Sequence, residues 1–355
     1  MNLGIICEFN PFHKGHKYLI DSVKKDGDKI ICVMSGSFVQ RGEPAVFDKF
    51  KRTSDALDNG ADLVIELPTR YSTLSAQGFA RAGVALLEAT GVCDALAFGA
   101  ECDDVNELKR LACEIKNKER EILKELEKGI SYPVARQNVI QSPVLESPNN
   151  ILALEYLSCT SLKPVAVKRI GLGHDCADCE YSASEIRKSL SKDETARLEN
   201  CERAVLYKLR TMSAEDFKKI EDVSEGLENR ITEAVKTAGS LDELYDLIKT
   251  KRYTHSRIRR IILRAFLGIE KGCPDTPGYI RILGFNESGK ELVSQIKKSA
   301  SLPLITKYSD AKALGGEVLK EFENECRFTD IHSLCYKTPR PCGLEMTSKI
   351  IINQR

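Results

Sequence analysis

The residues best suited to chemistry lie together near the start of the chain, at residues 10–16 with the sequence NPFHKGH. Two of the protein's five histidines, His13 and His16, stand there with Gly15 between them. In the first turn of a helix this spacing puts both imidazoles on one face, where they can donate hydrogen bonds to phosphate oxygens. Gly15 leaves the backbone open to a ligand. An ordinary polar helix start is the alternative, but the pattern as a whole predicts a phosphate-binding turn.

Such a turn needs a strand before it and a helix after it, and the sequence predicts both. Residues 3–7 form a short apolar run, and residues 14–25 have helical periodicity. Ligands of parallel sheets bind at the carboxyl ends of strands. The following helix directs its unpaired N–H groups and the positive end of its dipole to the same place, which favours an anion.

Apolar runs alternate with helical patterns over the first 170 residues. Short strands that alternate with helices indicate an α/β fold with a parallel sheet covered on both faces. The expected strands are residues 3–7, 29–34, 62–67, 95–98 and 164–170. The expected helices are residues 14–25, 47–59, 75–89, 105–128 and 148–159.

The pattern becomes mainly helical after about residue 193, with expected N-caps at Ser213, Ser240 and Thr254. We expect one strand at residues 279–285, a helix at 288–299, and a last long helix from about residue 315 toward the C-terminus. The change of pattern predicts a Rossmann-like nucleotide-binding domain over residues 1–192 and a mainly helical domain over residues 193–355.

Composition limits the class of protein without identifying it. The chain has 355 residues, with 53 Lys and Arg against 52 Asp and Glu, so net charge alone predicts no partner. Its thirteen cysteines are odd in number and scattered, with one CxxC pair at Cys176 and Cys179. A structural zinc at that pair is the alternative to free thiols, which indicate the cytoplasm. The N-terminus has no signal-peptide pattern, and no apolar run is long enough to span a bilayer.

A second candidate anion-binding element is YSASEIR at residues 181–187. Ser184 would cap a helix or touch phosphate, and Arg187, about one turn along, would face the same anion. A capped helix alone also explains this pattern. Together with the first element, however, it resembles the HxGH nucleotidyltransferase superfamily, which includes adenylyltransferases and class I aminoacyl-tRNA synthetases.

The closer resemblance is to the bacterial tRNA(Met) cytidine acetate ligase family. It is carried, in order, by GIICEFNPFHKGHKYLI, MSGSFVQRGEPAVFDKFKR, ADLVIELP with YSTLSAQGFA, and SPNNILALEYL. The family motif usually begins Val-Glu-Tyr where this chain has Cys7-Glu8-Phe9. The resemblance implies that acetate and ATP form acetyl-adenylate and pyrophosphate, and that the acetyl group passes to N4 of the wobble cytidine of elongator tRNA(Met). It implies no use of acetyl-CoA.

The resemblance also implies the residues of an ATP site, in which Mg²⁺ would bridge the phosphates. The implied catalytic residues are His13, His16 and Arg187. The implied ATP contacts are Cys7, Glu8, Phe9, Asn10, Pro11, Phe12, His13, Lys14, Gly15, His16, Lys17, Tyr18, Leu19, Ile20, Gly99, Asn150, Arg169, Ser184 and Arg187. A tight turn is the alternative for Gly99, a helix N-cap for Asn150, and a surface ion pair for Arg169. Glu8 is a candidate to position acetate or magnesium.

The polar loop at residues 35–44 follows the second expected strand and contains two glycines. Such a loop over the same sheet edge is a candidate lining for the acetate or cytidine pocket. Ser37, Gln40 and Arg41 are the residues of interest. An ordinary connecting loop is the alternative.

Residues 249–264 hold seven Lys and Arg residues and no acidic residue. Ile258, Ile261 and Ile262 recur on one helical face, which would leave the arginines outward. Basic charge with the aromatic groups of Tyr253 and His255 is typical of RNA binding. A solvated helix face is the alternative. The predicted tRNA contacts are Lys251, Arg252, Arg257, Arg259 and Arg260.

Two other functions remain open. A small-molecule adenylyltransferase of the nicotinate-nucleotide or phosphopantetheine kind needs the same two elements, but not the long helical half. A non-catalytic RNA-binding protein could retain the fold, although the intact His13, His16 and Arg187 disfavour it. The sequence indicates neither the general base for acetyl transfer nor the oligomeric state.

Overall fold

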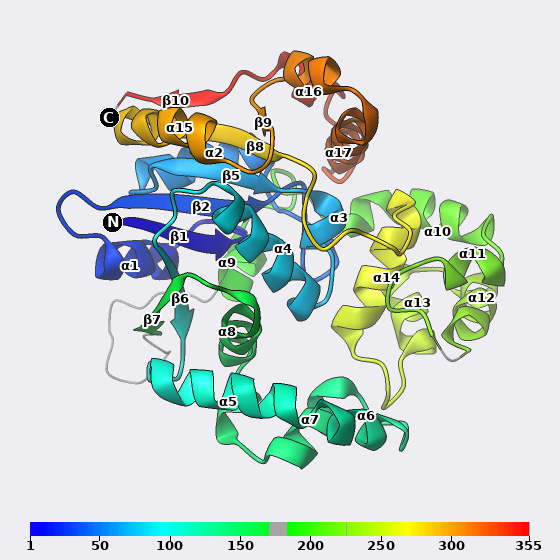
Figure 1. Cartoon of the computed structure of the whole chain (residues 1–355). Coiled ribbons are helices and arrows are strands. Elements are labelled where there is room, and N and C mark those ends of the chain that lie inside the picture. Colours follow the sequence, from blue (N-terminus) through cyan, green and yellow to red (C-terminus); the bar gives the residue numbers. More distant parts are fainter. Residues whose placement is uncertain (170–182, 225, 355) are drawn as a thin grey trace.

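A mixed, mostly parallel sheet forms the centre of the molecule (Figure 1). The computed structural model describes residues 1–169, 183–224 and 226–354. Within these residues the strand order is β10-β8-β5-β2-β1-β6-β7, and β9 pairs with β8. The first-half strands are β1 (Asn2–Cys7), β2 (Lys29–Ser35), β5 (Leu63–Leu67), β6 (Ala95–Ala100) and β7 (Lys163–Lys168). All five expected strands are therefore confirmed, and they run parallel to one another.

Both faces of the sheet are buried, which explains why its strands are continuous apolar runs. Ile31 and Val33 of β2 pack on one side with α4 (Ala76–Ala89) and α8 (Pro148–Cys159). Ile30 and Cys32 pack on the other side with α1 (Lys14–Val23) and α2 (Lys49–Asp58). The alternation along β2 follows from the two-residue period of a strand.

The first half also contains a separate two-stranded sheet, β3–β4, and several further helices. The expected helix at residues 105–128 is divided at Lys118 into two helices. These elements are β3 (Phe38–Val39), β4 (Glu43–Pro44), α3 (Thr69–Ser72), α5 (Val105–Asn117), α6 (Glu119–Leu126), α7 (Tyr132–Ile140), the 3-10 helix η1 (Pro143–Glu146) and α9 (Ala183–Ser189).

A helical lobe follows in the chain and lies beside the sheet (Figure 1). Its core includes Val205, Ile231 and Leu244. Ser213, Ser240 and Thr254 each cap a helix through the side-chain oxygen, as expected. The lobe consists of η2 (Leu198–Cys201), α10 (Glu202–Arg210), α11 (Ala214–Lys218), α12 (Leu227–Thr237), α13 (Leu241–Ile248) and α14 (His255–Leu267).

The end of the chain returns to the sheet, which corrects the expected division into residues 1–192 and 193–355. β8 (Ile280–Asn286) pairs antiparallel with β5, and β10 (Ile351–Asn353) pairs parallel with β8. Between them lie α15 (Glu287–Ser299), β9 (Leu304–Ile305), α16 (Tyr308–Leu314), α17 (Gly316–Ser333) and α18 (Leu344–Thr347). The expected last helix thus ends at Ser333 instead of continuing, and Pro339 and Pro341 follow in a segment that cannot extend it.

Charged side chains buried between α17, α18 and the sheet hold this returning segment in place. Lys49 forms ion pairs with Glu66, at 2.5 Å, and with Glu345, and Arg281 pairs with Glu345 at 3.2 Å. Glu325 accepts hydrogen bonds from the backbone N–H of Thr69, at 2.7 Å, and from its hydroxyl. Burial, with the neighbouring Glu66, raises the pKa of Glu325 to about 8. No helix of the described chain has the length and apolar composition needed to cross a bilayer.

Candidate active site

The turn after β1 is a tightly packed structure in which both histidines accept backbone hydrogen bonds. His13 is the N-cap of α1, and its Nδ1 accepts from the backbone N–H of Gly15 at 3.0 Å. His16 Nδ1 accepts from the backbone N–H of His13 at 3.3 Å. A neutral imidazole that accepts at Nδ1 carries its proton on Nε2. Each ring is therefore a donor at Nε2, which is the polarity that a phosphate oxygen requires.

Packing keeps these imidazoles uncharged. The two rings stack with centroids 3.8 Å apart, and Phe9 and Phe12 pack against His16 at 5.0 and 5.5 Å. Burial, helped by Arg169, lowers the pKa of His13 to about 4, and burial lowers the pKa of His16 well below its ordinary value. Both histidines are thus neutral donors at physiological pH.

Gly15 has a structural reason that the sequence did not show. A Cβ built at Gly15 would lie 2.9 Å from Cε1 and 3.1 Å from Nδ1 of His13. We expected the missing side chain to make room for a ligand, whereas in the structure the imidazole of His13 occupies that room. Gly15 therefore determines where His13 lies.

Arg187 comes to the same turn from a distant part of the chain. Its Nη1 donates to the backbone carbonyl of Asn10 at 2.8 Å, across 177 residues. Arg197 donates in turn to the carbonyl of Arg187 at 3.0 Å. The two expected anion-binding elements thus meet at the end of β1. Residues 170–182, with Cys176 and Cys179, lie outside the described residues, as does the side chain of Ser184.

Gly99, Asn150 and Arg169 lie near the carboxyl ends of β6 and β7. Gly99 is inside β6, and a Cβ there would lie 3.3 Å from Cγ of Arg169, so the tight-turn alternative is wrong. The N-cap of α8 is Ser147, so the N-cap alternative for Asn150 is also wrong. Instead, Oδ1 of the buried Asn150 accepts from the backbone N–H of Cys102 at 2.9 Å. Arg169 is half-exposed, and its Nε lies 3.7 Å from Oε1 of Glu101, within ion-pair distance.

The expected ATP segment at residues 7–20 includes side chains that face away from any ligand. Cys7 is buried, with its Sγ 3.6 Å from the carbonyl of Val33, and Ile20 lies in the core beneath the sheet. Asn10 is also buried and accepts from the backbone N–H of Val46 at 2.8 Å. These three residues could meet a nucleotide only through their backbone.

The chain matches known proteins over nearly its whole length. The family model for HIGH nucleotidyl transferases matches residues 1–205 and 192–345. A tRNA(Met) cytidine acetate ligase of Acetivibrio thermocellus is 38% identical, with 99% of each chain covered. One from Thermoanaerobacter sp. (strain X514) is 40% identical, over 98% of this chain and 99% of the relative. The chain belongs to the tRNA(Met) cytidine acetate ligase family.

The fold of this family member matches solved structures over its whole length. The crystal structure of Thermotoga maritima TmcAL bound with alpha-thio ATP is 31% identical, with a TM-score of 0.88 and complete coverage of both chains. The apo form of the same protein has a TM-score of 0.90. The α/β nucleotidyltransferase fold expected from the sequence is therefore confirmed.

The polar loop of this family member is a short hairpin, β3–β4, which is held by side chains from neighbouring segments. Oε1 of Glu8 accepts from the backbone N–H of Gln40 at 2.8 Å, and burial raises the pKa of Glu8. Ser37 is buried, with its hydroxyl 3.1 Å from that of Thr329, so it does not line an open pocket. Arg41 is exposed at the tip of the hairpin.

Arg52 is a positioning residue that the sequence analysis missed. Its side chain is fully buried and donates to four backbone carbonyls, those of Phe47, Glu8, Ser35 and Gly36. These carbonyls include the ends of both β1 and β2, so the guanidinium holds the strand ends that carry the site. The helical period was a usable signal, because Arg52 lies on the same face of α2 as the buried Ala56.

The basic stretch of this family member is partly internal, which corrects the expectation that its arginines point outward. Arg257 donates to the carbonyl of Asp222, and Arg260 pairs with the carboxylate of Asp222 at 3.0 Å. Arg264 is buried and donates to the carbonyl of Arg70 at 2.8 Å. The long side chains of these arginines reach polar groups of neighbouring segments. The apolar residues of α14 therefore do not define all of its buried face.

The remaining residues of that stretch differ in exposure. Tyr253 is buried beneath Arg257, with 5.0 Å between the guanidinium and the ring centroid, so it is not an open stacking surface. Lys251 and His255 are exposed, and Arg252 is half-buried. Arg259 is the one predicted tRNA contact that faces the hairpin, where it pairs with Glu43.

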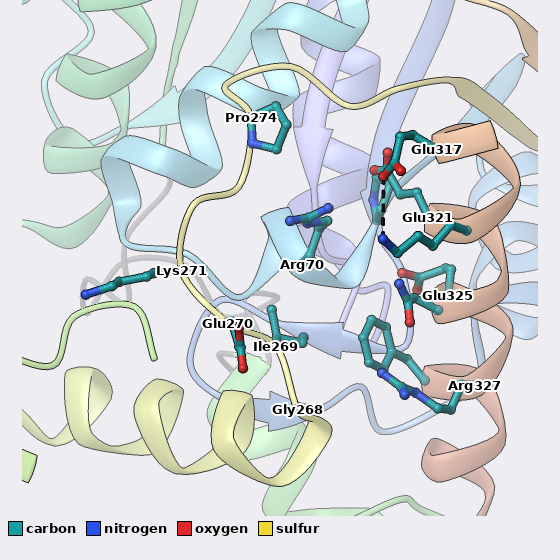
Figure 2. Close-up of a pocket in the computed structure, with 14 residues that line it drawn as sticks. Arg70, Gly268, Ile269, Glu270, Lys271, Pro274, Glu317, Glu321, Glu325 and Arg327 are labelled. Carbon is teal, nitrogen blue, oxygen red and sulfur yellow. Dashed lines mark ion pairs between the residues drawn. The ribbon is translucent and has the colours of Figure 1, made fainter. Parts of the chain in front are cut away.

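A cavity of about 470 Å³ lies apart from these residues, between α3, α17 and residues 268–274. Arg70 lies in its middle, and Glu317, Glu321 and Glu325 line it from α17 (Figure 2). Its described lining includes none of the residues that we predicted to contact ATP or tRNA. The cavity therefore belongs to the junction with α17 and not to the HxGH turn.

Proposed function

We propose that this protein is an ATP-dependent tRNA(Met) cytidine acetate ligase. It would activate acetate as acetyl-adenylate and pass the acetyl group to N4 of the wobble cytidine of elongator tRNA(Met). The observation that carries the proposal is the contact of Arg187 with the HxGH turn, in a chain that aligns over nearly its whole length with relatives of that name.

In the first step an acetate oxygen attacks the α-phosphorus of ATP, and the bond from that phosphorus to pyrophosphate breaks. Negative charge then develops on the oxygens around phosphorus and on the departing pyrophosphate. The Nε2–H groups of His13 and His16, the first N–H groups of α1 and the guanidinium of Arg187 would stabilise this charge, and their meeting at one turn supports these roles. Because the imidazoles are neutral, they would act as hydrogen-bond donors and not as fixed charges.

In the second step N4 of the cytidine attacks the acetyl carbonyl carbon. A bond forms between N4 and that carbon, the bond to the AMP oxygen breaks, and the proton that N4 loses passes to water or to a phosphate oxygen of the departing AMP. The cytidine must therefore reach the acetyl group at the same strand edge. The hairpin tip with Arg41 and the helical lobe lie around this edge.

Magnesium, when bound, would neutralise part of the negative charge of the phosphates. Mg²⁺ is usually bound through substrate phosphates with one or two carboxylates. In the described part of the chain no group of three His, Cys, Asp or Glu side chains could hold a metal ion. Glu8, at the end of β1, is the carboxylate that we propose for contact with the phosphate-bound ion.

The decisive experiment is mass spectrometry of tRNA nucleosides after incubation with labelled acetate. Acetate with ATP should label cytidine in tRNA(Met), and acetyl-CoA without ATP should not. His16→Ala should reduce pyrophosphate release about a hundredfold, the scale of losing one transition-state donor. Labelling by acetyl-CoA alone, or pyrophosphate release by the variant within threefold of wild type, would contradict the proposal.

A small-molecule adenylyltransferase remains the second candidate, because it uses the same turn. It predicts adenylation of nicotinate mononucleotide or phosphopantetheine by the wild-type protein, with no acetyl group on tRNA. The helical lobe argues against it, since such chemistry does not need a second lobe beside the site.

A further inference from the structure

A second cavity, of about 320 Å³, lies between the β3–β4 hairpin and the helical lobe, beside Arg187. Its walls come from the β3–β4 hairpin, the end of α9, η2, α13 and α14. Of the predicted ATP contacts whose side chains are described, Arg187 alone lines it. Of the predicted tRNA contacts, only Arg259 lines it. The cavity thus lies where a substrate from the lobe would meet activated acetate.

The cavity lining has an excess of positive charge among the residues that the structure describes. Its basic side chains there are Arg41, Arg187, Lys188, Arg197 and Arg259. The same part of the lining has two carboxylates, Glu43 and Glu199, so its formal charge is about +3. Burial and the nearby charge of Arg41 lower the pKa of Arg187, as expected for cations crowded away from water. An anion in the cavity would relieve this repulsion.

Arg259 is held in the cavity wall by a carboxylate and an aromatic ring. It forms an ion pair with Glu43, and its guanidinium lies 5.5 Å from the ring centroid of Tyr245. Its Nε–H is buried and has no acceptor among the described residues. The Arg259 side chain as a whole is 39% exposed and lines the cavity, so it is accessible to an anionic oxygen there.

The position of the cavity favours RNA phosphate over the phosphates of ATP. His13, His16, Gly99 and Arg169 do not line it, and the lobe forms one whole wall. Its volume lies at the lower end of the range for small-ligand sites, which suits about one nucleotide. Val46 and Leu198 supply an apolar part of the lining. We propose that this cavity binds the phosphodiester backbone next to the reactive cytidine, an inference that rests on the proposed function.

The test uses three variants of the full-length protein in the tRNA acetylation assay. Arg259→Ala and Arg41→Ala each remove one cavity cation, and Arg41 is exposed, so its loss cannot disturb the core. Each should raise the KM for tRNA about tenfold and reduce the slope of log affinity against log salt by roughly one unit. Lys208→Ala, which removes an exposed cation of α10 outside the cavity, should leave both values within twofold of wild type.

A fourth variant reverses the sign of the effect. Glu43→Gln removes a carboxylate from the cavity and should lower the KM for tRNA two- to threefold, by the order of one screened charge interaction. A general structural defect would instead raise it. The inference would be overturned if the KM for tRNA and the salt slope of Arg259→Ala and Arg41→Ala were the same as those of Lys208→Ala.

The KM for ATP identifies which phosphate the cavity binds. The inference expects it to change less than twofold in Arg259→Ala and Arg41→Ala. A tenfold rise in the KM for ATP would mean that the cavity holds the triphosphate, and would overturn the inference. Failure of the wild-type protein to acetylate tRNA would refute the proposed function itself. Normal acetylation by the wild-type protein, with an unchanged KM for tRNA in the variants, would refute only the inference about the cavity.

Discussion

At the scale of single residues, the HxGH turn shows how a backbone can set the chemistry of a side chain. The N–H groups of His13 and Gly15 occupy the Nδ1 atoms of His16 and His13, so the tautomer of each ring is determined by the first turn of α1. The sequence predicted two donors on one face, but it could not predict that burial keeps them neutral. Gly15 belongs to the same unit, because the His13 ring packs on it.

Gly15→Ala should therefore act through His13. The new methyl group would displace the imidazole, and we expect acetyl-adenylate formation to fall about ten- to a hundredfold with little loss of stability. The measurement is tRNA-independent pyrophosphate release by Gly15→Ala, by His13→Ala and by the double variant. Residues that act as one unit are non-additive, so the double variant should be no slower than His13→Ala. Fully additive losses would show that Gly15 has a separate role.

At the scale of elements, helices beside the sheet hold the loops at the strand ends. Arg52 of α2 binds carbonyls at the ends of β1 and β2, and Asn150 of α8 binds the backbone after β6. The strands alone would leave these polar backbone groups buried and unpaired. The catalytic edge is therefore built by side chains from elements that do not themselves face the ligand.

Arg52→Lys should destabilise the protein, because an ammonium group cannot bridge the four carbonyls that a planar guanidinium reaches. Leaving buried carbonyls unsatisfied predicts a loss of about 2–4 kcal/mol in the free energy of unfolding. The measurement is urea denaturation, with Arg110→Lys as the matched control because Arg110 is exposed on α5. Equal effects of the two substitutions would contradict the role of Arg52.

At the scale of the whole molecule, the last part of the chain closes the fold. β8 and β10 extend the sheet beyond β5, and α17 packs against the β3–β4 hairpin. Nε2 of the buried His332 donates to the carbonyl of Ala45 at 2.7 Å. Burial lowers the pKa of His332 to about 4. The hairpin beside the active site is thus held by a residue from the far end of the chain.

This contact predicts a pH dependence of stability. An unfolded histidine binds its proton near pH 6.5 and the folded His332 only near pH 4, so protonation favours the unfolded state. The contribution is complete above about pH 6.5 and declines toward pH 4, by at most about 1.4 kcal/mol per pH unit. His332→Gln keeps a donor for Ala45 and should flatten the pH dependence of the free energy of unfolding between pH 7 and 4.5.

The matched control for this prediction is His255→Gln, because His255 is exposed at the start of α14. Its pH dependence should follow that of the wild-type protein. Unfolding of all three proteins in urea at several pH values is the measurement. Parallel curves for His332→Gln and the wild-type protein would mean that His332 contributes nothing in this range.

The sequence by itself determined the features that depend on near neighbours. The strands of the first half, the HxGH turn before α1 and the caps Ser213, Ser240 and Thr254 follow from short-range periodicity and hydrogen bonding, and the structure confirms them. Only the tertiary structure decided which distant groups meet. Arg187 reaches Asn10 across 177 residues, and β8 reaches β5 after the chain has built a separate lobe.

The arginines of α14 show the physical reason for this limit. The spacing of these arginines is the same whether they contact water, a carbonyl or a carboxylate. Arg257, Arg259 and Arg260 therefore cannot be distinguished from the sequence. In the structure Asp222 binds two of them, and Arg259 alone faces the cavity beside Arg187. Local pattern determines where an element begins and which apolar face it buries. The partner of a long polar side chain depends on packing between remote segments.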